Sequence, residues 1–119
     1  EIVAVTGDGS YVFSCPTAVF WMARKYNAPF MTVIFNTQGW NAPKMITTGE
    51  HPDGYAAQAG AFWTSFDPPA ALDKVAEAAG GAFARTVSDP KELEAALQAG
   101  RKAVKGGISA VINVLIDPV

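Results

Sequence analysis

The chain has 119 residues, half of them hydrophobic and 17% charged, with a net charge of −2. This length suits one domain with a single core, and the nine scattered Lys and Arg residues form no basic cluster of the kind that nucleic-acid binding requires. Cys15 is the only cysteine, which excludes an internal disulfide and a multi-cysteine metal site. A single cysteine suits a reducing compartment, so we expect a cytoplasmic protein and leave an organellar location open.

The chain opens on an apolar run at residues 2–5, which is far too short to cross a membrane and follows no basic leader. We therefore expect no membrane partner. A strand of the buried type at the very start, without an initiating Met, indicates a piece cut from a longer protein.

Residues 2–5 are predicted to form a strand, and 16–26 a helix with Pro16 in its first turn. Helical spacing predicts a core-facing stripe on this helix, made of Val19, Met22, Ala23 and Tyr26. The apolar run 30–35 predicts a second strand that is buried on both faces, as in a parallel sheet.

Residues 36–66 lack periodicity but are rich in Gly, Pro and aromatic residues, so we expect a long functional loop there. Lys44 and His51 are its candidate ionisable groups. An exposed loop histidine is the simpler interpretation of His51. For Lys44, contact with a phosphate or carboxylate and a solvated side chain are equally compatible with the sequence.

The second half predicts two more helix–strand units. Asp67 with its two following prolines is expected to open a helix that Gly80 and Gly81 end, before a strand at 82–87. Asp89 is expected to cap the next helix, and 108–116 to form the last strand. This order predicts an α/β fold with a mainly parallel sheet flanked by helices.

The candidate site lies where the first two strands end. Gly7 and Gly9 are expected to take positive φ and admit an anion, with the N–H groups of Gly9 and Ser10 pointing at phosphate oxygens. Asp8 would repel a phosphate unless a cation such as Mg²⁺ lay between them. The intervening residues 10–35 match a strand–helix–strand unit, which brings the turn 36–39 beside Asp8.

GDGS, followed about two dozen residues later by an Asn-led turn, resembles the diphosphate-binding motif of thiamine diphosphate (ThDP) dependent enzymes. The stretches GDGSYVFSCPTAVFWMARKYNAPF and NTQGWNAPK are most similar to the acetolactate synthase and 2-oxoacid decarboxylase branch, and the similarity continues through residues 65–97. The resemblance implies a cofactor-binding set of Gly7, Asp8, Gly9, Ser10, Asn36, Thr37 and Gly39.

Within this set the resemblance makes Asp8, Thr37 and the carbonyl of Gly39 the Mg²⁺ ligands. One position departs from the family motif, which usually has a second Asn where this chain has Thr37. A Thr hydroxyl can coordinate Mg²⁺ but reaches less far than an amide oxygen.

The resemblance also implies a role. The chain would be the C-terminal part of a ThDP-binding domain, acting with N-terminal domains of the same protein, in a dimer or tetramer, on a 2-oxoacid or related acyl donor. Decarboxylation, carboligation and acyl-CoA lysis all stay open. In the family, a Glu on another domain activates the cofactor, and neither Glu50 nor Asp53 matches it. The fragment alone is therefore expected to lack turnover.

Three other interpretations stay open. Gly-Asp-Gly between a strand and a helix can be no more than a turn. A non-catalytic or degenerate α/β module with a role in folding or assembly would tolerate Thr37. Another phosphate or nucleotide binder is disfavoured, because neither GxGxxG nor GxxxxGK[ST] occurs at the first strand end.

Overall fold

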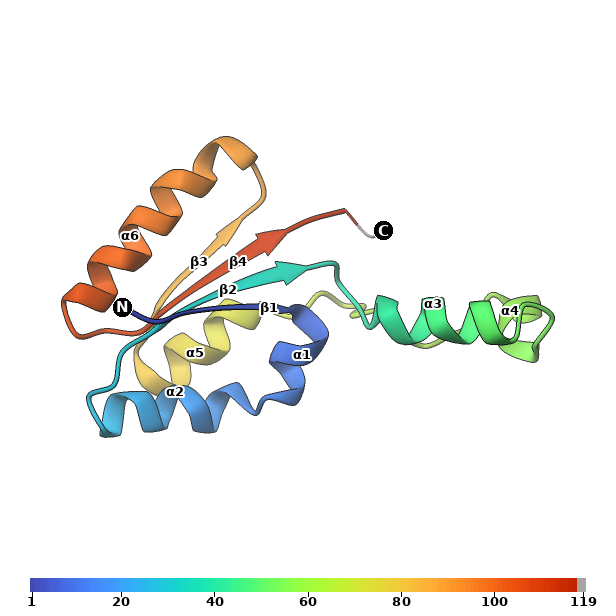
Figure 1. The fold of residues 1–119 in the computed structure, drawn as a ribbon, viewed down its shortest axis with the longest axis horizontal. Coiled ribbons are helices and arrows are strands. Elements are labelled where there is room, and N and C mark those ends of the chain that lie inside the picture. Colours follow the sequence, from blue (N-terminus) through green and yellow to red (C-terminus); the bar gives the residue numbers. More distant parts are fainter. Residues whose placement is uncertain (118–119) are drawn as a thin grey trace.

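A computed structural model describes residues 1–117, and within them four strands form one parallel sheet in the spatial order β1-β2-β4-β3 (Figure 1). The strands are β1 (Val3–Gly7), β2 (Met31–Asn36), β3 (Phe83–Val87) and β4 (Ala110–Leu115). The helices are α1 (Asp8–Phe13), α2 (Pro16–Lys25), α3 (Asn41–Glu50), α4 (Tyr55–Ala59), α5 (Leu72–Gly80) and α6 (Leu93–Lys105), with a 3₁₀ turn at Pro90–Glu92. The predicted α/β fold with a parallel sheet is confirmed.

The sheet is covered on both faces. Helix α6 packs on one face, whereas α1, α2 and α5 lie on the other (Figure 1). Successive side chains of a strand point to opposite faces, so β2 and β4 contribute to a hydrophobic core on each face of the sheet. Val33 and Ile112 pack under α6, and Ile34 and Val111 pack under α5. Burial on both faces explains why these two strands read as apolar runs without alternation.

β1 differs from the buried strand that its sequence predicts. It pairs with β2 along one side, and within the described residues nothing pairs with its other side. Val3 and Val5 are consequently 52% and 62% exposed. Apolar composition alone cannot tell a central strand from an edge strand, because that depends on which segments pair.

The helix predicted at 16–26 is present as α2, and a further helix that was not predicted, α1, precedes it. α1 begins directly at Asp8, and α2 begins at Pro16 as expected, after Cys15 in a left-handed conformation with φ 53°. The predicted core stripe is wrong except for Ala23, since Val19, Met22 and Tyr26 are exposed. Phe20 is buried instead, because α2 packs mainly against α5 rather than directly on the sheet.

The expected long loop after β2 is also wrong. Helices α3 and α4 occupy much of it and project from the sheet as an arm (Figure 1). Neither helix contains a buried residue. A helix that faces no core needs no apolar periodicity, so the sequence pattern gave no signal for it.

The last two helices begin later than predicted. α5 begins at Leu72, and Asp67 does not cap it. A proline ring clashes with the residue before it and disfavours helical backbone at that residue. The Pro68–Pro69 pair therefore delays the start of the helix. Asp89 does act as a cap, accepting a 2.9 Å hydrogen bond from the Lys91 N–H, but it caps the 3₁₀ turn that precedes α6.

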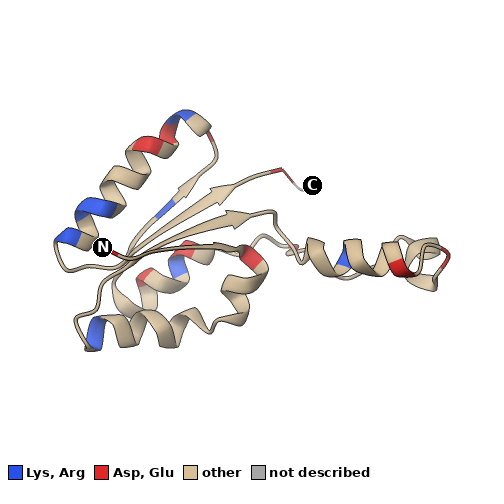
Figure 2. Ribbon diagram, in the orientation of Figure 1, with Lys and Arg blue, Asp and Glu red and all other residues tan. Residues whose placement is uncertain are grey.

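Charged side chains are dispersed over the surface, with Lys and Arg on several helices and on β3 rather than in one patch (Figure 2). Across residues 1–117, no helix is long and apolar enough to cross a membrane.

Candidate functional site

The ends of β1 and β2 lie side by side, with Gly7 paired to Phe35. Helix α1 begins at Asp8 immediately after β1, and the turn 36–39 follows β2 directly. The carboxyl ends of these parallel strands therefore bring Asp8 and the turn together. This is the edge at which α/β sheets form their ligand crevices.

Asp8 connects the two strand ends. Its side chain is almost fully buried, and its two oxygens accept hydrogen bonds from the N–H of Gly9, at 2.9 Å, and of Gly39, at 3.0 Å. The Thr37 hydroxyl oxygen lies 3.4 Å and 3.5 Å from the same two oxygens. The carboxylate is thus held by donors from both strand ends.

Three hard oxygen atoms meet at this point. The Thr37 Oγ1 atom lies within 3.5 Å of the Asp8 carboxylate and 3.5 Å from the Gly39 carbonyl oxygen. Residues 1–117 contain no group of three or more His, Cys, Asp or Glu side chains placed to hold a metal. A cation here would use one carboxylate together with hydroxyl and carbonyl oxygens, a donor set that fits Mg²⁺ completed by phosphate oxygens.

The glycines of the site do not take positive φ, and at Gly9 and Gly39 the absence of a side chain permits close packing instead. Gly7 is extended at φ −82°, and Gly9 belongs to helix α1, so the expected left-handed conformations are wrong. A Cβ atom on Gly9 would lie 2.5 Å from Trp40 Cδ1, and one on Gly39 would lie 2.6 Å from the Thr64 carbonyl oxygen. Nothing lies within 4 Å of a Cβ built on Gly7, which leaves that position open.

A cavity of about 480 Å³ opens in front of these residues. Of the predicted cofactor-binding set, its lining includes Gly7, Asp8, Gly9, Ser10, Thr37 and Gly39. The walls are completed by apolar side chains, among them Phe13, Phe35, Trp40 and Met45. The cavity therefore combines an apolar wall with oxygen and N–H groups at one end, as small-molecule sites generally do.

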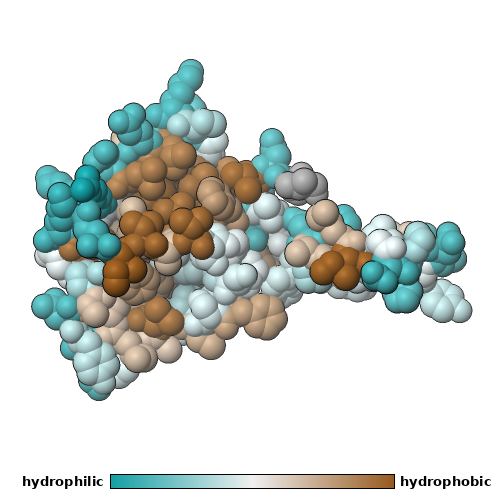
Figure 3. All heavy atoms as spheres, viewed as in Figure 1, coloured by the Kyte–Doolittle hydropathy of each residue, from teal (hydrophilic) through white to brown (hydrophobic). Residues whose placement is uncertain are grey.

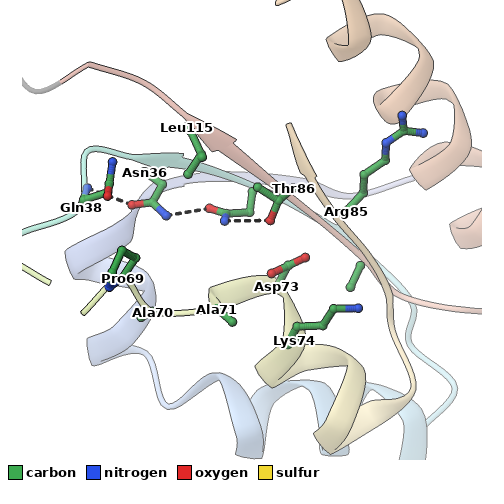
Figure 4. A pocket seen from close by; sticks show the side chains of 12 residues that line it. Asn36, Gln38, Pro69, Ala70, Ala71, Asp73, Lys74, Arg85, Thr86 and Leu115 are labelled. Atoms are coloured by element: carbon green, nitrogen blue, oxygen red, sulfur yellow. Dashed lines mark hydrogen bonds between the residues drawn. The ribbon is translucent and has the colours of Figure 1, made fainter. Parts of the chain in front are cut away.

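Asn36 lies on the other side of the turn, in a second crevice of about 680 Å³ (Figure 4). Its Oδ1 atom accepts a bond from the Gln38 N–H at 2.9 Å, while its Nδ2 atom donates to Asn113 Oδ1 at 3.0 Å. Asn113 in turn donates to Thr86 Oγ1 at 3.1 Å. Asn36 thus shapes the turn instead of facing the cavity, and β4 supports it through Asn113, a residue that its apolar surroundings in the sequence did not single out.

Residues 64–66, which follow the arm, also contact the turn 36–39 and Trp40. Gly39 and Ser65 form an antiparallel bridge, and the Trp40 N–H donates to the Thr64 carbonyl at 2.8 Å. The Trp40 ring meets Phe66 edge-on, with ring centroids 4.8 Å apart. These contacts join residues more than twenty positions apart in the sequence, which no local pattern can reveal.

Lys44 and His51 do not join this site. Lys44 lies on α3 with its Nζ atom 5.8 Å from the centre of the Phe62 ring, and His51 is exposed at the end of α3. Glu50 and Asp53 are likewise exposed on the arm. The structure therefore brings none of these four residues next to Asp8.

Fold and site together define an α/β domain with a largely apolar crevice that has oxygen and N–H groups at one end, at the carboxyl ends of two parallel strands. Residues 1–114 match the family described as thiamine pyrophosphate enzyme, C-terminal TPP binding domain. The chain belongs to this family of ThDP-binding domains.

Two curated relatives are each 32% identical to the chain over 119 residues. They are a probable acetolactate synthase from Mycobacterium bovis and the acetolactate synthase large subunit IlvG from Mycobacterium tuberculosis. The match covers 99% of this chain but 19% of each relative, so the chain spans about a fifth of their length.

Two solved structures share the fold. Benzoylformate decarboxylase from Polynucleobacter necessarius aligns with a TM-score of 0.76 at 20% identity, over 100% of this chain and 20% of its own. The ThDP-dependent 4-hydroxybenzoylformate decarboxylase of Rhodococcus jostii RHA1 aligns with a TM-score of 0.72 at 17% identity, over 98% of this chain and 20% of its own.

Proposed function

We propose that this chain holds Mg²⁺ and the diphosphate of ThDP, as part of an acetolactate synthase-like enzyme that acts on 2-oxoacids or related acyl donors. The observation that carries the proposal is the meeting of the Asp8 carboxylate, the Thr37 hydroxyl and the Gly39 carbonyl at adjacent strand ends. Family membership supports the cofactor, and the names of the relatives and structural neighbours support the substrate class.

Each residue has a definite task in this proposal. Asp8, Thr37 and Gly39 hold the cation, while the open position at Gly7 gives the diphosphate room to approach beside Gly9 and Ser10, which line the same cavity. Asn36 keeps the turn in shape from the crevice behind it. When bound, ThDP supplies the carbanion chemistry, and the protein positions it.

The Thr37 hydroxyl can turn from Asp8 to a cation without movement of the main chain. Its contacts with Asp8 are long, at 3.4 Å and 3.5 Å, whereas the two N–H bonds to Asp8 are 2.9 Å and 3.0 Å. The N–H bonds would keep Asp8 in place while the weaker contact is exchanged. Thr37 is therefore compatible with the metal role that the family motif usually gives to Asn.

In this proposal, the other groups that the reaction needs lie outside this chain. The acid that activates the cofactor would come from an N-terminal domain of the same protein, within a dimer or tetramer. The fragment by itself would bind without turnover. Whether the reaction is a decarboxylation or a carboligation depends on substrate contacts outside these residues.

Calorimetric titration of the chain with ThDP, with and without Mg²⁺, tests the proposal. We expect binding that depends on Mg²⁺ and that is lost in Asp8→Asn, which keeps the size of the side chain but removes its charge. Asp8→Ala should also destabilise the fold by about 1–3 kcal/mol, because the buried Gly39 N–H loses its acceptor.

Asp89→Asn is the matched control, since it makes the same change at an exposed helix cap remote from the cavity. It should leave ThDP binding unchanged. ThDP binding that does not depend on Mg²⁺, or that is retained in Asp8→Asn, would contradict the proposed metal site. Absence of binding to the chain and to a longer protein that contains it would favour the degenerate module that Thr37 leaves open.

A further inference from the structure

The turn that carries two of the proposed metal ligands has a strained residue at its centre. Gln38 lies between Thr37 and Gly39 and takes a left-handed conformation, with φ 60°. A residue with a side chain rarely adopts this conformation, because its Cβ atom comes too close to the main chain. Such a conformation persists only where surrounding contacts hold it. The positions of Thr37 and Gly39 therefore depend on the contacts that hold Gln38.

Two hydrogen bonds hold the main chain of Gln38. Its carbonyl oxygen accepts a bond from the Phe66 N–H at 2.8 Å, and its own N–H donates to Asn36 Oδ1 at 2.9 Å. The second bond depends on how the Asn36 side chain is turned, since the nitrogen end of its amide group can only donate. If this amide group flipped, the Gln38 N–H would face another donor. Whatever fixes the Asn36 amide group therefore helps to fix the turn.

Asn113 fixes that amide group from the neighbouring strand. The Asn36 Nδ2 atom donates to Asn113 Oδ1 at 3.0 Å, and Asn113 Nδ2 donates in turn to Thr86 Oγ1 at 3.1 Å (Figure 4). Both Asn side chains are buried. Each amide group presents its oxygen to one neighbour and its nitrogen to the next, so the orientation of Asn113 determines that of Asn36. These bonds link the adjacent strands β3, β4 and β2 and lead to the turn.

We infer that Asn113 is a positioning residue for the cation: it holds the Asn36 amide group and, through it, the turn 36–39. This rests on the proposed function and gives a residue of β4, outside the cavity beside Asp8, a part in cation binding. The simpler alternative is that Asn113 serves stability alone, as a buried polar group that its neighbours satisfy. Only a positioning role makes the affinity for Mg²⁺ depend on Asn113 beyond any loss of stability.

Asn113→Leu tests the inference, because leucine has nearly the shape of asparagine but neither accepts nor donates a hydrogen bond. The chain would be titrated calorimetrically with ThDP at a series of Mg²⁺ concentrations, which gives the apparent affinity for Mg²⁺. We expect this affinity to fall about tenfold, the effect of one lost hydrogen bond. Asn113→Thr should behave alike, since its oxygen lies one bond closer to the main chain and stops short of Asn36. Threonine also suits a strand, so this variant serves if Asn113→Leu does not fold.

Gly80→Ala is the matched control for stability. It introduces a Cβ atom 2.4 Å from the Phe20 carbonyl oxygen, where α5 meets α2, so it destabilises the fold at a contact outside the turn. Its affinity for Mg²⁺ should be unchanged. Adding Gln38→Gly to Asn113→Leu should recover about fivefold of the loss, because glycine takes the left-handed conformation without strain. A double variant that binds Mg²⁺ as weakly as Asn113→Leu would show that Asn113 does not act through Gln38.

The Gln38 amide provides a readout that needs no ligand. Its hydrogen exchange, followed by ¹H–¹⁵N NMR, should be faster in Asn113→Leu than in Gly80→Ala. If Asn113→Leu loses stability but keeps both this exchange rate and its Mg²⁺ affinity, or if Gly80→Ala weakens Mg²⁺ binding as much, the inference is wrong. If Gln38 exchange responds as expected but the unmodified chain binds no ThDP at any Mg²⁺ concentration, the proposed function is wrong, and not the hold of Asn113 on the turn.

Discussion

Tyr11 places a polar atom in the hydrophobic core. Its side chain is 3% exposed and packs against Phe20, and among the described residues its hydroxyl has no hydrogen-bond partner. We therefore expect Tyr11→Phe to leave the free energy of unfolding unchanged or to raise it by about 1 kcal/mol, because it removes an unsatisfied group. Urea denaturation measures this, with the exposed Tyr26→Phe as control. A clear loss of stability would mean that the hydroxyl has a partner.

The same residue predicts a dependence on pH. Burial, and secondarily the negative charge of Asp73, raise the pKa of Tyr11 above its ordinary value of 10.0. The unfolded chain ionises at a lower pH than the folded chain, so the free energy of unfolding falls as pH rises from about 10 toward the pKa of Tyr11 in the folded state. Below pH 10 this loss is absent. The unmodified chain should thus lose more stability above about pH 10 than Tyr11→Phe, by at most about 1.4 kcal/mol per pH unit. If the free energy of unfolding fell equally with pH in the two proteins, this prediction would be contradicted.

At the scale of elements, the contact between α2 and α5 depends on Gly80. A Cβ atom at Gly80 would lie 2.4 Å from the Phe20 carbonyl oxygen, so the two helices could not keep their spacing. We expect Gly80→Ala to destabilise the chain by about 1–3 kcal/mol. Gly49→Ala, within exposed α3, meets nothing within 4 Å and should be neutral or stabilising by up to about 1 kcal/mol. Thermal unfolding compares the two, and equal effects would show that the close contact is not rigid.

The elements also show where sequence patterns succeed. The runs that became β2 and β4 were both predicted as strands, and the run of β2 as one buried on both faces, because such burial leaves a local signature in composition. The α2 stripe was mispredicted because helical spacing identifies an apolar face but not the partner that covers it. The start of α5 was placed too early for a local reason, the restriction before Pro69.

At the scale of the whole molecule, the α3–α4 arm stands apart from the core. The molecule measures 53 × 31 × 23 Å, and the arm extends along its long axis (Figure 1). Because no residue of α3 or α4 is buried, these helices should open at far lower free energy than α6 and β4. Hydrogen exchange followed by mass spectrometry should show fast exchange in 41–59 and slow exchange in 93–115. Similar protection in both segments would mean that the arm is held by contacts outside the chain.

The apolar edge of the sheet should cause self-association of the isolated chain. β1 exposes Val3 and Val5, and hydrophobic atoms gather between α6 and α2, where β1 runs (Figure 3). Exposed parallel edges with apolar side chains pair readily with other chains. Val5→Lys should lower the average mass measured by analytical ultracentrifugation, whereas Thr48→Lys, on the exposed arm, should not. An unmodified chain that is monomeric at high concentration would contradict this expectation.

The sequence by itself determined the α/β class, the parallel central strands and the convergence of Asp8 with the turn 36–39. These follow from local apolar runs and from a spacing that fits one strand–helix–strand unit. The tertiary structure alone decided that β1 is an edge, that Gly9 makes room for Trp40, and that Asn113 and Thr64 support the turn. The reason is physical: a side chain's role in a site depends on neighbours distant in sequence, and local periodicity records only where apolar residues recur along the chain.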